Sequence, residues 1–82
     1  MKLQDKIKTL ENNYVFIRWA MGAEYGKLKY VGEDYVEFDI VDVDTMSYRE
    51  TMLISSNLIF EVAVGGYDIS RIVAEISSQL TQ

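Results

Sequence analysis

Apolar and polar residues alternate along most of the chain between residues 14 and 64, a pattern typical of half-buried β-strands. The first such stretch runs from Tyr14 to Met21, where Val15, Ile17, Trp19 and Met21 share one face of a half-buried strand and the residues between them share the other. Glycine, serine and acidic residues interrupt the alternation at short intervals and mark turns. We therefore expect five strands over residues 14–21, 25–31, 35–43, 48–54 and 58–64, with turns at 22–24, 32–34, 44–47 and 55–57.

Helical periodicity flanks this strand region on both sides. Leu3, Ile7 and Leu10 recur at helical spacing, which predicts an amphipathic helix within residues 1–11 that ends at two asparagines. A second helix is expected over residues 68–80, with Asp68 as its N-cap. Its apolar stripe consists of Ile69, Ile72, Val73, Ile76 and Leu80.

Five short strands can bury an inner face only by curling into a small, partly open barrel. Gly26 lies inside the second strand, where a glycine marks a bend or a close backbone approach. In that strand we expect Leu28 and Tyr30 to share one face, and Lys27 and Lys29 to share the other. The chain contains no proline, repeat or low-complexity tract, which predicts a single domain over residues 1–82. Barrels of the SH3, OB and Sm types are candidates, and a helix followed by five uninterrupted strands favours the Sm type.

The composition narrows the possible chemistry. The 82 residues include no cysteine and no histidine, which excludes disulfides, thiolate metal sites and nucleophiles that depend on histidine. No pair of carboxylates, lysine or serine lies in a pattern that indicates catalysis. We therefore expect a protein that is not an enzyme, with no catalytic residue, no metal site and no cofactor.

The net charge of −5 argues against tight nonspecific binding of nucleic acid. The charge is unevenly distributed, at +3 over residues 1–29 and −8 over residues 30–82. This asymmetry predicts one locally positive and one strongly negative surface. No apolar run is long enough to span a membrane and the N-terminus lacks a secretory pattern, so we expect a cytoplasmic protein without a membrane partner.

Acidic residues cluster in and after the third strand, at Glu37, Asp39, Asp42 and Asp44. A calcium loop starting at Asp42 would need a central glycine and a terminal glutamate, whose position is held by Leu53. The cluster is therefore interpreted as a solvated acidic hairpin.

Three segments resemble the Sm/LSm family. The segment Tyr25-Gly26-Lys27-Leu28 is similar to the Gly-x-Leu of the family's second strand, and Glu33-Asp34 lies near the family's acidic residue. Residues 53–62 resemble the family's Ile-Arg-Gly turn and the short apolar strand after it. The resemblance covers residues 3–64 and is nearest to short, divergent marine phage-type members. It implies a ring of five to seven copies that binds single-stranded RNA or DNA.

Two departures from the family pattern bear on this function. Ser55-Ser56 stands where the family has Arg-Gly, so the cation that contacts RNA is missing. The family's asparagine at the start of the third strand has no match among residues 35–37. A ring that serves as a structural or protein-interaction scaffold, without nucleic-acid binding, is therefore the alternative hypothesis.

The resemblance also implies which residues meet a partner. In the ring, the fifth strand of one copy would pair with the fourth strand of the next, through Leu58, Ile59, Phe60 and Val62. The alternative is that these side chains belong to the core. Single strands would be bound by Tyr35 through stacking, by Ser55, Ser56 and Asn57 through hydrogen bonds, and by the basic band of Lys27 and Lys29. The alternative is that these lysines and tyrosines are ordinary surface and strand residues.

Overall fold

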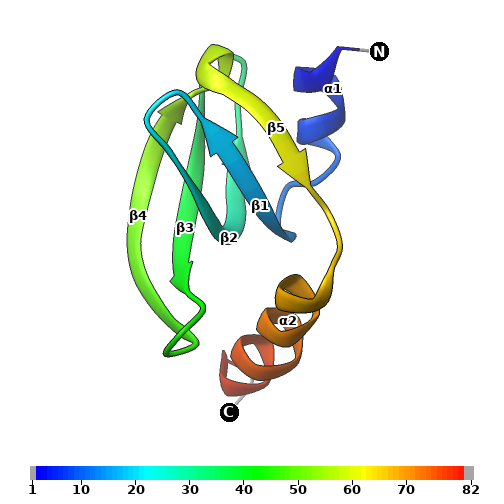
Figure 1. Ribbon diagram of the computed structural model, residues 1–82. Coiled ribbons are helices and arrows are strands. Elements are labelled where there is room, and N and C mark those ends of the chain that lie inside the picture. Colours follow the sequence, from blue (N-terminus) through cyan, green and yellow to red (C-terminus); the bar gives the residue numbers. More distant parts are fainter. Residues whose placement is uncertain (1, 81–82) are drawn as a thin grey trace.

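Five antiparallel strands form one strongly bent, unclosed sheet, preceded and followed in the sequence by a helix, as expected (Figure 1). The computed structural model describes residues 2–80, and for residues 77–80 it describes the backbone alone. The helices and strands are α1 (Leu3–Lys8), β1 (Tyr14–Trp19), β2 (Gly22–Val31), β3 (Tyr35–Asp42), β4 (Ser47–Ser55), the 3-10 turn η1 (Ser56–Leu58), β5 (Ile59–Ala63) and α2 (Tyr67–Leu80).

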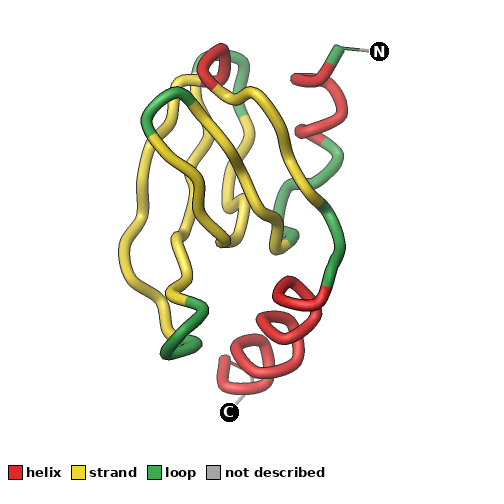
Figure 2. Tube along the Cα trace, in the orientation of Figure 1, coloured by secondary structure: helices red, strands yellow, loops and turns green. Residues whose placement is uncertain are grey.

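The strand order is β4-β3-β2-β1-β5, and every neighbouring pair is antiparallel. Strands β1 to β4 follow one another as hairpins, whereas β5 crosses back through η1 to pair with β1 (Figure 2). The two ends of the sheet are therefore β4 and β5. Because the sheet does not close on itself, both strands keep one edge that pairs with no strand of the described chain.

The described apolar side chains form two separate cores. The larger one fills the barrel and includes Ile7 of α1. The smaller core lies under α2, where Ile72 and Ile76 pack against Val41 and Met46. Neither of the described helices has the length and apolar character that a membrane crossing requires.

The first hairpin turns earlier than the sequence predicts. Residues 20–21 form the turn, and Gly22 already belongs to β2, so the expected turn at 22–24 is wrong. Met21 is 85% exposed and does not share the buried face of Val15 and Trp19, because β1 ends at Trp19 and the alternation of the strand ends with it. Val15, Ile17 and Trp19, which were expected to share one face, are all buried.

A β-bulge in β2 overturns another expectation. The pairing with β3 shifts by one residue between Leu28 and Tyr30, so that Leu28 and Val31 are both buried. Tyr30, expected on the same face as the buried Leu28, is instead 43% exposed. One extra residue in a strand moves every later side chain to the opposite face, and this is the physical reason for the error.

The helix boundaries also differ in detail. Helix α1 ends at Lys8 rather than near residue 11, and Asn12 adopts a left-handed conformation with φ of 71°, as asparagine tolerates after a helix. Helix α2 begins at Tyr67, so Asp68 lies in its first turn and is not its N-cap. The Asp68 carboxylate instead accepts a hydrogen bond of 3.3 Å from the Tyr25 hydroxyl.

Gly26 makes the close approach that the sequence predicts. A Cβ atom at this position would collide with the backbone carbonyl oxygen of Asp39 and would lie 2.9 Å from the ring of Phe38. Gly26 pairs with Val15 and Ile40, whose side chains are buried inside the barrel. The missing side chain therefore leaves room for the Phe38 ring and lets β2 and β3 curl together.

Candidate nucleic-acid interface

Two loops that the sequence assigns to nucleic-acid binding meet at one end of the barrel. The Ser56 amide donates a hydrogen bond of 2.9 Å to the Asp34 carbonyl, and the Ser56 hydroxyl donates one of 3.2 Å to the Gly32 carbonyl. The β1–β2 turn joins them, since the Ala20 amide donates to the Leu58 carbonyl at 3.0 Å. We call this end of the barrel the turn end; in Figure 1 it is the upper end.

The structure brings four of the six predicted nucleic-acid residues together at the turn end. Tyr35 pairs with Ser55 across β3 and β4, and its side chain is 42% exposed. The Ser55 hydroxyl donates to the Asn57 side-chain oxygen at 2.7 Å, whereas the Ser56 hydroxyl donates to the Gly32 carbonyl of the neighbouring turn. A serine hydroxyl has one hydrogen to donate. In this arrangement both serines shape the loop and offer only acceptors, which a phosphate does not need.

Tyr30 and Lys8, which the sequence did not indicate as binding residues, lie next to Tyr35 at the turn end. The rings of Tyr30 and Tyr35 are 5.4 Å apart between centroids and tilted by 44°. The Lys8 ammonium of α1 lies 5.7 Å from the centroid of the Tyr30 ring. Lysine and tyrosine side chains in this relation form a cation–π contact. Helical spacing predicts that Lys8 lies on the solvent-facing side of α1. The bulge that turns Tyr30 outward has no corresponding signal in the sequence.

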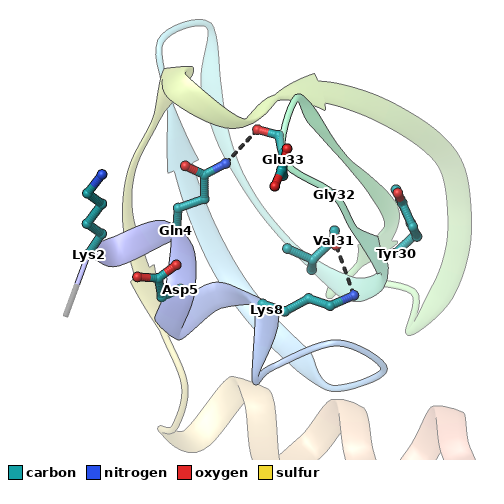
Figure 3. A pocket seen from close by; sticks show the side chains of 8 residues that line it. All are labelled: Lys2, Gln4, Asp5, Lys8, Tyr30, Val31, Gly32 and Glu33. Carbon is teal, nitrogen blue, oxygen red and sulfur yellow. Dashed lines mark hydrogen bonds between the residues drawn. The ribbon is translucent and has the colours of Figure 1, made fainter.

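A cavity of about 650 Å³ opens between α1 and the turn end (Figure 3). The side-chain amide of Gln4 donates to the Glu33 carbonyl at 2.5 Å, and Lys8 donates to the Val31 carbonyl at 3.1 Å, so both residues connect α1 to the end of β2. The cavity is lined by Lys2, Gln4, Asp5, Lys8, Tyr30, Val31, Gly32 and Glu33. Two cationic side chains, Lys2 and Lys8, and two anionic ones, Asp5 and Glu33, balance there, so the lining of the cavity carries no net charge.

Glu11 holds the same region in place. Its carboxylate accepts a hydrogen bond of 2.7 Å from the Val31 amide and pairs with Lys8 at 3.1 Å. The Val31 hydrogen bond, followed by the Lys8 hydrogen bond, lowers the pKa of the Glu11 carboxyl below its usual value. Glu11 therefore fixes Lys8 beneath Tyr30 and anchors the segment after α1 to β2.

The lowered pKa of Glu11 predicts a pH-dependent contribution to stability. A carboxyl group whose pKa is lower in the folded state stabilises the fold above its unfolded pKa, about 4.3 for glutamate, and loses that effect as the pH falls through the folded pKa. We expect Glu11→Gln to melt at a lower temperature than the wild type at pH 7, and the difference to shrink as the pH falls from about 5 to 3. Melting curves followed by circular dichroism measure this. Asp44→Asn, which removes an exposed carboxylate from the β3–β4 turn, is the control. A difference in melting temperature between Glu11→Gln and the wild type that is the same at pH 7 and at pH 3 would contradict the role of Glu11.

The other two predicted nucleic-acid residues, Lys27 and Lys29, lie elsewhere. They line a groove with Tyr14, Tyr48 and Ile76 of α2, and this groove shares no lining residue with the cavity at the turn end. Tyr25, two residues before Lys27 in β2, donates a hydrogen bond to Asp68 of α2. The structure thus divides the six predicted residues between two surfaces.

The four residues predicted for the subunit interface also divide. Phe60 is 62% exposed and Leu58 is exposed as well, whereas Ile59 is buried in the barrel core and Val62 packs against that core. On the other free edge, β4 exposes Leu53, a residue that the sequence reasoning did not assign to the interface.

Asp42, the last residue of β3, stabilises the β3–β4 turn. The Asp42 carboxylate accepts hydrogen bonds from the amides of Asp44 and Thr45, at 2.9 and 3.4 Å. The part of the chain that the structure describes contains no group of three or more acidic side chains that could hold a metal ion.

Comparisons of the chain with protein-family models, with curated proteins and with solved structures find no match. The resemblance to the Sm/LSm family therefore stays a prediction, based on the segments around Gly26 and Ser55.

Proposed function

We propose that copies of this chain assemble into a closed Sm-like ring of five to seven subunits that binds single-stranded RNA or DNA at the turn end. One observation carries the proposal: an unclosed sheet whose two free edges, β4 and β5, both expose large apolar side chains. Each protomer would supply β5 to β4 of the next.

The character of the two edges supports the assembly. Native proteins usually protect a free strand edge with lysine, proline or a covering element. The strand β5 has the sequence Ile-Phe-Glu-Val-Ala, with Glu61 as its one charged residue. On β4, Leu53 is 66% exposed. Because the two edges belong to different strands, their contact is heterologous, and such contacts produce a ring when the rotation between subunits closes.

The aromatic pair at the turn end supports the choice of ligand. Tyr30 and Tyr35 present two partly exposed rings beside the Lys8 ammonium. Stacking of a base on an aromatic side chain contributes about 1–3 kcal/mol and tolerates any base, since every base has a π-face. A ring repeats this weak site in each subunit, so that a single strand contacts several copies and the affinities combine.

Fluorescence anisotropy with labelled U-rich, A-rich and mixed single strands tests the binding. We expect affinity that falls between 50 and 200 mM salt, as phosphate contacts require. Tyr30→Ala and Tyr35→Ala should each weaken binding about tenfold, the size expected from one lost stack. Tyr67→Ala, which removes a 79% exposed tyrosine from α2, is the matched control. Strong binding that neither Tyr30→Ala nor Tyr35→Ala reduces would show that the turn end is not the site.

The scaffold without nucleic-acid binding is the second candidate. Two observations favour it: the hydroxyls of Ser55 and Ser56 donate to acceptors of the protein itself, on Asn57 and Gly32, and charges balance in the cavity beside α1. A particle with the mass of a ring that leaves the anisotropy of every labelled strand unchanged at 50 mM salt would select this function.

A further inference from the structure

The groove that contains Lys27 and Lys29 lies on the outer face of the sheet, beside α2. Tyr14, Lys27, Asp39 and Thr51 are successive register partners across β1, β2, β3 and β4, so they form one row on that face. The groove has a volume of about 280 Å³, near the lower limit of ligand pockets. Its lining residues are Tyr14, Lys27, Lys29, Asp39, Val41, Tyr48 and Ile76.

The cations of this groove are not engaged by acidic neighbours. The Lys27 ammonium lies 5.8 Å from the centroid of the Tyr14 ring. Among the described residues the ion pairs involve Lys8, Arg18, Arg49 and Arg71, and neither Lys27 nor Lys29 takes part in one. Two ammonium groups with donors to spare, next to aromatic rings, match a ligand that combines an anionic group with a planar ring.

A chain of hydrogen bonds fixes the acceptors on the opposite side of the groove. The Thr51 hydroxyl donates to the Asp39 carboxylate at 2.6 Å, and this uses its one hydrogen. The 2.7 Å contact between the hydroxyls of Tyr48 and Thr51 must therefore have Tyr48 as the donor. The Tyr48 oxygen and the second Asp39 oxygen are left as acceptors, so this side of the groove favours a ligand that donates N–H groups.

We infer that this groove binds one nucleotide whose base carries an exocyclic amino group. The base lies against the apolar floor of Val41 and Ile76 near the two tyrosines, its amino group donates to Asp39, and its phosphate contacts Lys27 and Lys29. Adenine and cytosine present such an amino group, whereas uracil presents a carbonyl oxygen at the same place. The choice of a nucleotide rests on the proposed function, and the nucleotide is either free or part of a bound strand.

Titration of the full chain with AMP, CMP, UMP and inorganic phosphate, followed by ligand-observed NMR, tests the inference. We expect AMP and CMP to bind about tenfold more tightly than UMP, as one base-edge contact distinguishes bases, and phosphate to bind more weakly than any of them. Asp39→Asn keeps an oxygen that accepts from Thr51 and replaces the free acceptor by an N–H donor. This variant should therefore reverse the preference toward UMP, which a purely structural role of Asp39 would not do.

Two further variants test the remaining contacts. Tyr48→Ala and the double variant Lys27→Met, Lys29→Met should each weaken AMP binding about tenfold. Lys6→Met and Tyr67→Ala, which alter exposed residues outside the groove, should leave it unchanged. Equal affinity for AMP, UMP and phosphate, or loss of AMP affinity in the control variants, would overturn the inference.

The outcomes separate this inference from the proposed function. Binding of AMP that depends on Asp39, in a protein that binds no oligonucleotide, would support a site for a free nucleotide and contradict the strand-binding function. Oligonucleotide binding that depends on Tyr35, together with no AMP or CMP binding and no effect of Tyr48→Ala, would support the function and overturn the groove. Weaker binding of an A-rich strand in Tyr48→Ala would identify the strand as the source of the nucleotide.

Discussion

Replacement of Gly26 by alanine is expected to lower the free energy of unfolding by about 2–3 kcal/mol, the upper part of the range for an overpacked core. The new methyl group would collide with the Asp39 carbonyl oxygen, which belongs to the backbone of β3, and it would press on the buried Phe38 ring. Neither neighbour is the end of a flexible side chain, so the two strands must separate. Urea denaturation or a melting temperature lowered by about 10–20 °C measures the effect.

Gly65→Ala is the matched control, because a Cβ atom there meets no heavy atom within 4 Å. We expect this variant to melt within a few degrees of the wild type. If Gly26→Ala melts at the same temperature as Gly65→Ala, the close approach of β2 and β3 does not require a glycine. The tight curl of the barrel would then have another cause.

The architecture could be predicted because the inner face repeats every second residue. Val36, Phe38 and Ile40 alternate with Glu37 and Asp39, and the three apolar side chains are buried inside the barrel. The same rule fails where the period is broken. The bulge between Leu28 and Tyr30 inserts one residue. The residue between them is Lys29, which is neither a glycine nor a typical turn residue, so the sequence does not predict the bulge.

The candidate site was predictable to the extent that it depends on strand order. Adjacent hairpins bring the loops at residues 32–35 and 55–57 to the same end, where Tyr35 pairs with Ser55 and the Ser56 amide donates to the Asp34 carbonyl. Lys8 and Tyr30 were missed because their meeting depends on how α1 lies against β2. That placement is set by Glu11, whose carboxylate binds the Val31 amide, a contact between residues 20 positions apart.

The groove on the outer face could be predicted only in part. Alternation correctly predicted that Lys27 and Lys29 point away from the core, but it could not assign their aromatic neighbours. Tyr14 faces Lys27 because β1 and β2 pair in that register, and Tyr48 reaches the groove from β4 through its bond to Thr51. Cross-strand partners become known only when the register is known.

The subunit contact yields the second large expected effect. Leu53→Lys, on β4, and Phe60→Lys, on β5, each place a charge on one free edge and leave the other edge intact. Both side chains are more than 60% exposed, so the fold of the protomer should survive either change. We expect each variant alone to be a particle of 9.5 kDa in multi-angle light scattering, in place of a ring of five to seven copies.

Mixing the two variants then tests the direction of the contact. The intact β4 of the Phe60→Lys protein can pair with the intact β5 of the Leu53→Lys protein, but no further subunit can be added at either blocked edge. A heterologous contact therefore predicts a dimer of twice the protomer mass in the mixture and in neither variant alone. A symmetric contact between two β5 strands would instead leave Leu53→Lys dimeric by itself. Val73→Lys, on the exposed face of α2, should keep the mass of the ring, and a wild type of 9.5 kDa at micromolar concentration would contradict the ring itself.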